Sequence, residues 1–454
     1  MTDVVVIGAG VAGLLCASRL AAAGLETVVL EARPRIGGRV HTYEPADGGP
    51  ELELGAQVVH GDRNPAHALM GSGALPALPR PGTARVVAGR VARPMGALAA
   101  TGHPPWLLEA RLAAGEALPG PADDGSLASW LDAAGATGAA RAAAAEWFRQ
   151  TWAADPAELS ARAVARAAGS DDAGRGEFFV PGGFAGLPRK LAAGLDVRVD
   201  SPVRTIGWTA GQVRVETPAG VLRARRAVVA VPPAVVARGS LLIEELPGHK
   251  QRAARELRPG DAYCAVVVLS AAAPETASVF DADGITGFVS CRRGRPEVLV
   301  VAKGAAAARV RAAAESPEGL KALLAVALPW ADTARVEAVH AADWGRDEWS
   351  GGAFTAPLLG AEQASAHWAE PVADTLFFAG EATETGTRLP WIQGALASGE
   401  RAAAEVLRAA VNDERVERDE RVERDVRDVR DVRDVRDVRD QDHRQDGQVE
   451  TVRR

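Results

Sequence analysis

Short apolar runs and stretches of helical periodicity alternate from the start of the chain. Residues 4–7 form a β-branched run, and a glycine-rich turn and a helix-like stretch over residues 14–23 follow it. A second apolar run covers residues 27–30. Continuous apolar runs of this length are typical of strands in a parallel sheet that is covered on both faces. The pattern therefore predicts a strand, a turn, a helix and a second strand.

Similar apolar runs recur along the chain and predict further strands. They lie at residues 51–61, 197–206, 227–233, 265–269, 297–302 and 375–381. Residues 71–175 differ, because they are rich in Ala, Gly and Pro and carry helical patches at 106–114 and 139–152. We expect the aromatic residues of those patches to pack in a core rather than to line a pocket.

The first glycine turn has the spacing of a dinucleotide site. Gly8 makes the tight turn, Gly10 lets the backbone approach a pyrophosphate, and Gly13 lets the helix pack closely on the strand. The N–H groups and dipole of the helix then favour phosphate. Glu31 ends the second strand, where a carboxylate accepts hydrogen bonds from the adenosine ribose. A glycine turn alone can be purely structural, but the flanking strand, helix and acid favour dinucleotide binding.

A second glycine pair, flanked by arginines, follows that acid. Gly37 and Gly38 lie between Arg35 and Arg39, an arrangement suited to a second stretch of diphosphate. Residues 30–39 resemble the amino-terminal signature of the flavin-containing amine oxidase family, which includes monoamine, polyamine and L-amino-acid oxidases. The resemblance implies that the cofactor is FAD. It assigns to the cofactor site Gly8, Gly10, Gly13, Glu31, Ala32, Arg33, Gly37, Gly38 and Arg39.

Four later segments resemble further motifs of this family, in the same order. The resemblance implies that they contact the flavin ring, the adenine, the ribityl chain and the flavin N1 and O2 atoms respectively. The helix that begins near Gly394 would stabilise negative charge on the reduced flavin. The residues concerned are Gly55, Ala56 and Gln57, then Val203, then Gly380 and Glu381, then Gln393, Gly394 and Ala395. His60 follows the first of these motifs, and we expect it to be a structural hydrogen-bonding residue.

Three residues are expected at the reacting centre. The resemblance places Phe354 and Trp391 as two aromatic walls over the flavin; the alternative is that both merely pack. The family usually has a lysine at the position of Cys264, bonded through water to flavin N5, so reoxidation by oxygen is in question here. Lys303 lies in a later segment and is left without a role. Some relatives carry a flavin-bound cysteine where this chain has Ala353, so we expect FAD to be non-covalent.

The composition of the chain argues against several classes of binding partner. The chain has 454 residues, 47% of them hydrophobic, and a formal net charge of −7, which argues against nucleic acid or an anionic membrane as a partner. Three widely spaced cysteines suit a reduced cytoplasm, and no apolar run is long enough to span a membrane. No metal-ligand spacing is present, so no metal is expected. We allow for a homodimer.

Beyond residue 411 the composition changes abruptly. Five consecutive Val-Arg-Asp triplets cover residues 426–440. A three-residue valine repeat cannot keep one apolar face on a helix of 3.6 residues per turn. We therefore predict that residues 412–454 form a charged, low-complexity tail that is disordered or transiently helical.

Together these features predict an α/β protein with a Rossmann-type FAD-binding domain and an inserted substrate domain of mixed β-sheet and helices. The FAD domain is assigned to 1–70, 176–238 and 370–411, and the substrate domain to 71–175 and 239–369. The resemblance implies oxidation of a small-molecule amine or amino acid by hydride transfer to flavin N5, giving an imine, with oxygen or another acceptor reoxidising the flavin. Two alternatives stay open: a desaturase or dehydrogenase acting on a larger biosynthetic intermediate, and a flavin-binding scaffold.

Overall fold

The computed structural model describes residues 2–71, 75–77, 84–118, 120, 125–170, 172–385, 391–413 and 415. Contacts between residues divide the chain into two compact units, Met1–Ala403 and Ala404–Arg454. The fold and the site described below belong to the first unit. In the second, residues 404–413 are helical, and the predicted Val-Arg-Asp tail lies outside the described residues.

The first sheet has a parallel centre built from segments far apart in the sequence. β1 (Thr2–Ile7) lies between β2 (Thr27–Leu30) and β12 (Gly220–Val229), and all three run parallel. The other strands of this eight-stranded sheet are β9 (Asp196–Arg198), β10 (Thr205–Thr209), β11 (Gln212–Thr217), β13 (Leu242–Ile243) and β19 (Leu376–Phe378). The sheet thus brings together the amino-terminal motif and the strand that leads to Glu381.

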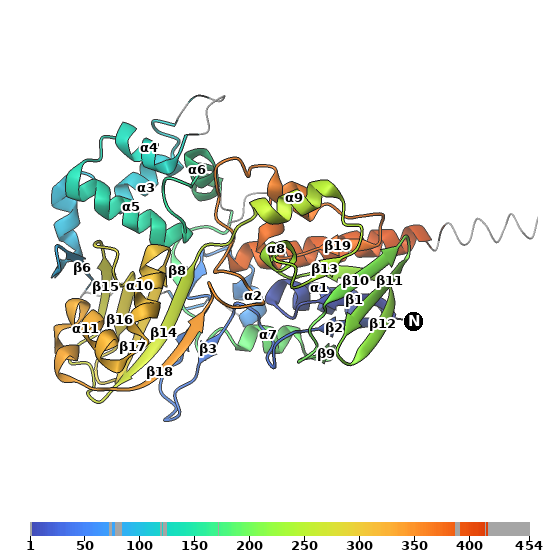
Figure 1. Ribbon diagram of the computed structural model, residues 1–454, viewed down its shortest axis with the longest axis horizontal. Coiled ribbons are helices and arrows are strands. Elements are labelled where there is room, and N and C mark those ends of the chain that lie inside the picture. Colours follow the sequence, from blue (N-terminus) through green and yellow to red (C-terminus); the bar gives the residue numbers. More distant parts are fainter. Residues whose placement is uncertain are drawn as a thin grey trace, which may run out of the picture. The chain divides into compact units, whose positions relative to one another are not determined.

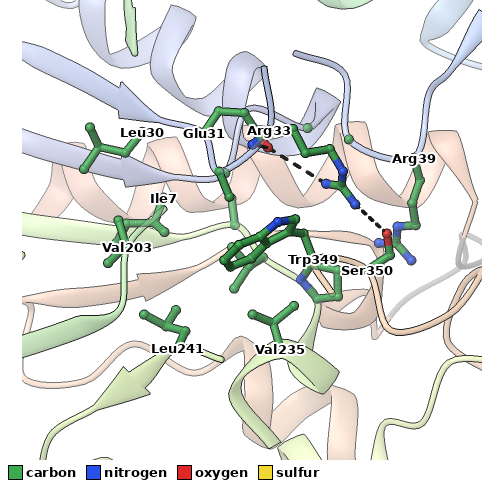
Figure 2. Close-up of a pocket in the computed structure, with 17 residues that line it drawn as sticks. Ile7, Leu30, Glu31, Arg33, Arg39, Val203, Val235, Leu241, Trp349 and Ser350 are labelled. Carbon is green, nitrogen blue, oxygen red and sulfur yellow. Dashed lines mark hydrogen bonds and ion pairs between the residues drawn. The ribbon is translucent and has the colours of Figure 1, made fainter. Parts of the chain in front are cut away.

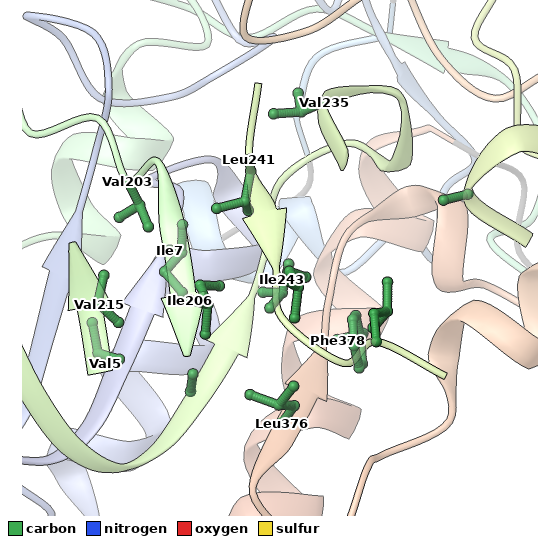
Figure 3. Close-up of a cluster of buried hydrophobic side chains, with 14 of the residues drawn as sticks. Val5, Ile7, Val203, Ile206, Val215, Val235, Leu241, Ile243, Leu376 and Phe378 are labelled. Atoms are coloured by element: carbon green, nitrogen blue, oxygen red, sulfur yellow. The ribbon is translucent and has the colours of Figure 1, made fainter. Parts of the chain in front are cut away.

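Side chains from this sheet form one continuous apolar core. Val5, Ile206 and Phe378 are fully buried although they come from three distant segments (Figure 3). The valine-rich runs fit here because residues of a central parallel strand are covered on both faces. The core fixes the carboxyl ends of β1 and β2, which carry the glycine turn and Glu31.

A second, seven-stranded sheet is mainly antiparallel and lies beside a group of helices (Figure 1). At its centre, β14 (Ala262–Leu269) pairs with β17 (Glu297–Lys303) and β18 (Val336–Asp343). The remaining strands are β6 (Ala84–Ala88), β7 (Val91–Pro94), β15 (Ala277–Asp281) and β16 (Phe288–Cys291). Two pairs stand apart, β3 (Thr42–Tyr43) with β4 (Leu52–Glu53), and β5 (Val59–His60) with β8 (Glu177–Phe178).

Helices cover both sheets, and an apolar cluster packs α3, α4, α5 and α6 together. In chain order the α-helices are α1 (Val11–Ala22), α2 (Ala66–Met70), α3 (Pro105–Ala113), α4 (Leu127–Ala133), α5 (Gly138–Trp152), α6 (Ala161–Ser170), α7 (Gly186–Leu191), α8 (Pro233–Ala237), α9 (Gly248–Glu256), α10 (Ala305–Ala313), α11 (Pro317–Ala327) and α12 (Ala364–Ala369). Short 3₁₀ turns are η1 (Met95–Thr101), η2 (Pro329–Thr333) and η3 (Glu381–Thr383). A further helix starts at residue 392.

One predicted strand is largely replaced by turns. Residues 51–61 contain only the two short strands β4 and β5. The reason lies at Gly55, where a Cβ atom would come within 1.9 Å of the Arg39 carbonyl oxygen. The chain crosses the Arg39 backbone there, so residues 54–58 leave the strand.

The predicted fold class is confirmed, while the predicted domain boundaries stay a prediction. No helix in the described part of the chain is long and apolar enough to cross a membrane.

Candidate active site

The glycine turn after β1 has the shape that a diphosphate requires. Gly8 has φ of +105°, and a Cβ on Gly13 would lie 2.1 Å from the Gly8 carbonyl oxygen, so neither position accepts a side chain. A Cβ on Gly10, in contrast, would meet no protein atom within 4 Å. The backbone at Gly10 therefore faces open space at the amino end of α1, where N–H groups favour an anion.

The second glycine pair packs directly against the first. The Gly37 N–H donates to the Ala9 carbonyl over 2.8 Å, and a Cβ on Gly38 would lie 3.2 Å from the Gly10 Cα. Gly37 and Gly38 both have positive φ, of +100° and +58°. The two glycine segments thus form one backbone cradle.

A pocket that is partly open to solvent lies beside this cradle (Figure 2). Glu31 stands in its wall with 4% of its surface exposed, and its carboxylate accepts hydrogen bonds from the N–H groups of Ala9 (2.8 Å) and Arg33 (2.9 Å). Eight of the predicted cofactor residues line the cavity: Gly8, Gly10, Glu31, Ala32, Arg33, Gly38, Arg39 and Val203. A buried carboxylate beside an open glycine backbone suits an adenosine ribose and its diphosphate, so the residues present fit FAD.

A segment distant in the sequence also lines this cavity, and its residues were not among those predicted to bind the cofactor. Trp349 and Ser350 belong to the wall, and Figure 2 shows Trp349 between Arg33 and Val203. The Arg33 guanidinium donates to Ser350 Oγ over 2.8 Å and pairs with Asp347. The guanidinium of Arg204 lies 4.8 Å from the centre of the Trp349 ring.

Arg39 connects the two halves of the predicted cofactor site. Its guanidinium donates to Glu381 Oε1 over 2.8 Å and to the Ala353 carbonyl over 2.9 Å. Glu381 is 6% exposed and also accepts hydrogen bonds from the N–H and hydroxyl of Thr355, at 3.3 and 3.1 Å. This buried ion pair therefore fixes the chain on both sides of Phe354.

The other predicted cofactor residues make close backbone contacts around the Arg39–Glu381 pair. The Ala56 N–H donates to the Arg39 carbonyl (3.2 Å), the Gln57 amide to the Glu53 carbonyl (2.5 Å), and the Gly380 N–H to Ser398 Oγ (2.9 Å). Gln393 is fully buried and accepts a bond from the Asn64 amide, and Gly394 and Ala395 lie in the first turn of the helix that starts at residue 392.

The two predicted aromatic walls contact different neighbours. Trp391 stacks on Trp152 of α5, with ring centres 5.9 Å apart, and lies 4.2 Å from the ring of His60. Phe354 follows Ala353 directly, and the ammonium of Lys303 lies 5.4 Å from its ring centre. Trp152, His60 and Lys303 are thus additional residues of this region.

The imidazole of His60 and the thiol of Cys264, which lie near these aromatic residues, are held in their uncharged forms. Burial, together with the charge of Lys303, lowers the pKa of His60 to about 4. Cys264 on β14 is 3% exposed, and burial raises the pKa of its thiol to about 11. Burial also lowers the pKa of Lys303. Within the described residues no group of His, Cys, Asp and Glu side chains could hold a metal ion.

Comparisons with known proteins agree with this geometry. Residues 11–407 match the family model of flavin-containing amine oxidoreductases. A Mycobacterium tuberculosis protein named as a flavin-containing monoamine oxidase, AofH, is 30% identical over 460 residues, covering 89% of this chain and 96% of that protein. A putrescine oxidase structure has a TM-score of 0.72 at 23% identity, over 89% of this chain and 99% of that one. A cyclohexylamine oxidase from Brevibacterium oxydans has a TM-score of 0.70 at 22% identity, over 91% and 99%.

Proposed function

The chain belongs to the flavin-containing amine oxidoreductase family and is therefore an FAD-dependent oxidoreductase acting on amines, and we propose that it oxidises a small primary or secondary amine held between Phe354 and Trp391. When bound, FAD would supply a hydride acceptor for the carbon next to the substrate nitrogen. The chain's own residues bind the cofactor, orient the amine and exclude water.

Binding is divided between the two ends of the site. The Gly8, Gly10 and Gly38 backbone would hold the diphosphate, and Glu31 would accept hydrogen bonds from the ribose hydroxyls. The buried pair of Arg39 and Glu381 would hold the ribityl end. These backbone and carboxylate contacts need no covalent bond, and Ala353 offers no thiol, so FAD would be released in full when the protein is denatured in acid.

The aromatic residues would orient the substrate. The indole of Trp391 is held between Trp152 and His60, so its plane is fixed. Phe354 is fixed through its backbone, because its carbonyl accepts a bond from the Gly260 N–H over 3.0 Å. Two walls of fixed orientation would hold the α-carbon of an amine in one position, which is one way that a binding site accelerates such a reaction.

The observation that carries this proposal is the buried Arg39–Glu381 pair, because it joins the FAD-fitting cavity to Phe354 within one connected network. The comparisons do not favour the desaturase alternative, since the relatives named above are amine oxidases by name.

The experiment is an anaerobic titration of the purified holoenzyme with monoamines, diamines and L-amino acids, followed by admission of air. We expect one class of amine to bleach the flavin band. If the flavin band recovers in air and hydrogen peroxide forms, the protein is an oxidase. If the band stays bleached in air, the protein is a dehydrogenase that needs another electron acceptor. Failure of every amine to bleach a fully loaded protein would overturn the proposal.

A further inference from the structure

One wall of the cofactor pocket comes from outside the first sheet. The lining residues up to Leu241 belong to that sheet and to the segments that connect its strands, and Val203 and Leu241 are buried in its core (Figure 3). Beyond Leu241, the described lining residues are Trp349 and Ser350. Trp349 is only half-buried. Because closely packed cores move little, the wall formed by Trp349 is the one that can open.

Arg33 fixes the backbone of this wall. Its side chain is 12% exposed, and its guanidinium pairs with Asp347 and donates to Ser350 Oγ over 2.8 Å. The Asp347 carboxylate accepts further bonds from the Trp349 N–H and the Ser350 hydroxyl, both over 2.9 Å. The backbone of residues 347–350 is therefore held by polar contacts that are largely shielded from water.

The exposed residue Arg204 holds the side chain of the same wall. Its guanidinium lies 4.8 Å from the centre of the Trp349 ring, within the range of a cation–π contact, and donates to Glu348 Oε1 over 2.9 Å. The Arg204 and Glu348 side chains are 51% and 53% exposed. Exposed contacts of this kind are weak, so they are the part of the wall that yields first.

We propose that Arg204 is a positioning residue for the cofactor: its contacts with Trp349 and Glu348 keep the indole in the pocket wall and so slow the release of FAD. Release requires the Trp349 side chain to swing outward, while the backbone of residues 347–350 stays in place. This inference goes beyond the proposed function, because release of the cofactor does not depend on which amine is oxidised.

The test measures how fast the purified holoenzyme releases FAD, with no amine present. Protein loaded with radiolabelled FAD is mixed with a large excess of unlabelled FAD, and the label that stays on the protein is followed over time. At low ionic strength we expect Arg204→Met to release FAD about threefold to tenfold faster than the wild type. Arg204→Lys keeps the charge but loses the planar guanidinium, so its rate should lie between the two. Equal rates for the wild type and Arg204→Met would overturn the inference.

Ionic strength separates this role from a general loss of stability. Salt screens exposed charges, so it should weaken the contacts of Arg204 in the wild type. The ratio of the release rates of Arg204→Met and the wild type should therefore fall toward one as sodium chloride is added. A ratio that stays the same at every salt concentration would assign the effect to the fold and overturn the inference.

A double variant tests whether Arg204 acts through the indole. Trp349→Ala removes the ring that the guanidinium contacts. Adding Arg204→Met to Trp349→Ala should then leave the release rate within about twofold of Trp349→Ala alone, because the two side chains no longer interact. An undiminished effect of Arg204→Met in that background would contradict the proposal.

Arg258→Met is the matched control. Arg258 forms an exposed ion pair with Glu158 over 3.2 Å, with side chains 61% and 53% exposed, and is not among the described residues that line the cofactor pocket. Its substitution should leave the release rate unchanged. Should Arg204→Met fold poorly, Glu348→Gln removes only the ion pair and should speed release by a smaller factor; unchanged rates in both Glu348→Gln and Arg204→Lys would overturn the inference.

Discussion

The cavity beside Glu31 and the region around Phe354 are built in different ways. The cavity depends on backbone atoms of residues 8–13 and 37–38, whose positions follow from glycine conformation and short-range spacing. The region around Phe354 depends on side chains from β5, α5, β14 and β17, each positioned by packing between distant segments. In the first region Gly8, Gly13 and Gly37 have no room for a Cβ atom, whereas the second region is defined by charge and ring orientation.

The largest expected effect is at Gly13. In Gly13→Ala the new Cβ would meet the Gly8 carbonyl oxygen at 2.1 Å, and backbone on both sides cannot move cheaply. We expect complete loss of FAD binding and a lower melting temperature. Gly10→Ala is the matched control: its Cβ meets no protein atom within 4 Å, so the fold should persist while FAD affinity falls at least tenfold. Equal melting temperatures for the two variants would contradict this account.

The link between the two regions should be the next most sensitive feature. Glu381→Gln leaves the guanidinium of Arg39 without its carboxylate in a site where Glu381 is 6% exposed. The Arg39 side chain is 25% exposed, so losing its charged and buried partner should cost about 1.5–3 kcal/mol in the free energy of unfolding. Glu400→Gln breaks the exposed pair with Arg19 and should cost less than about 1 kcal/mol. Urea unfolding of each holoenzyme measures both, and similar losses would show that burial is not the cause.

The carboxyl group of Glu53, which lies beside the Gly55 segment, should make the stability of the protein depend on pH. Its carboxyl accepts bonds from the Phe184 N–H and the Thr42 hydroxyl, yet burial raises its pKa to about 7. Because the unfolded chain ionises near 4.5, stability should fall as pH rises from about 4.5 to 7 and then level off. The loss should be roughly 2–3 kcal/mol. In Glu53→Gln this pH dependence should disappear from denaturation curves; its persistence would assign it to another group.

The aromatic wall should give the smallest of these effects. Trp391→Ala removes a ring that is held by Trp152 and His60, so the substrate loses orientation rather than chemistry. We expect kcat/KM to fall about tenfold or more while FAD affinity is unchanged. Trp106→Ala on α3 removes an indole that is 39% exposed and should alter neither quantity. A fall in FAD affinity for Trp391→Ala would show that the two regions are not separable.

The two regions also differ in how well the sequence predicts their structure. β1, β2 and the glycine turn were predictable because a four-residue apolar run and three glycine positions determine them locally. The contact of Arg33 with Ser350 was not, because 317 residues separate the two. The segment 51–61 was predicted as one strand because its alternation is regular, but the crossing at Gly55 depends on Arg39, which no local pattern specifies.

The position of Lys303 shows the same limit in the other region. Its position opposite Ala262 follows from the register of β14 and β17, and its contact with Phe354 follows from packing against α5. The departure at Cys264 was visible in the sequence, but the neighbouring cation was not. Side-chain function in this region therefore had to come from three-dimensional structure.

The pair of Arg39 and Glu381 also has a consequence for the synthesis of the protein. The two residues are 342 positions apart, so Arg39 leaves the ribosome long before its partner exists. At ordinary rates of translation this interval is about 20–70 s. During that interval the ribityl end of the site cannot form, because Glu381 has not yet been synthesised. We therefore expect the cofactor to be captured securely only after Glu381 has left the ribosome, so that cells short of FAD would accumulate cofactor-free protein.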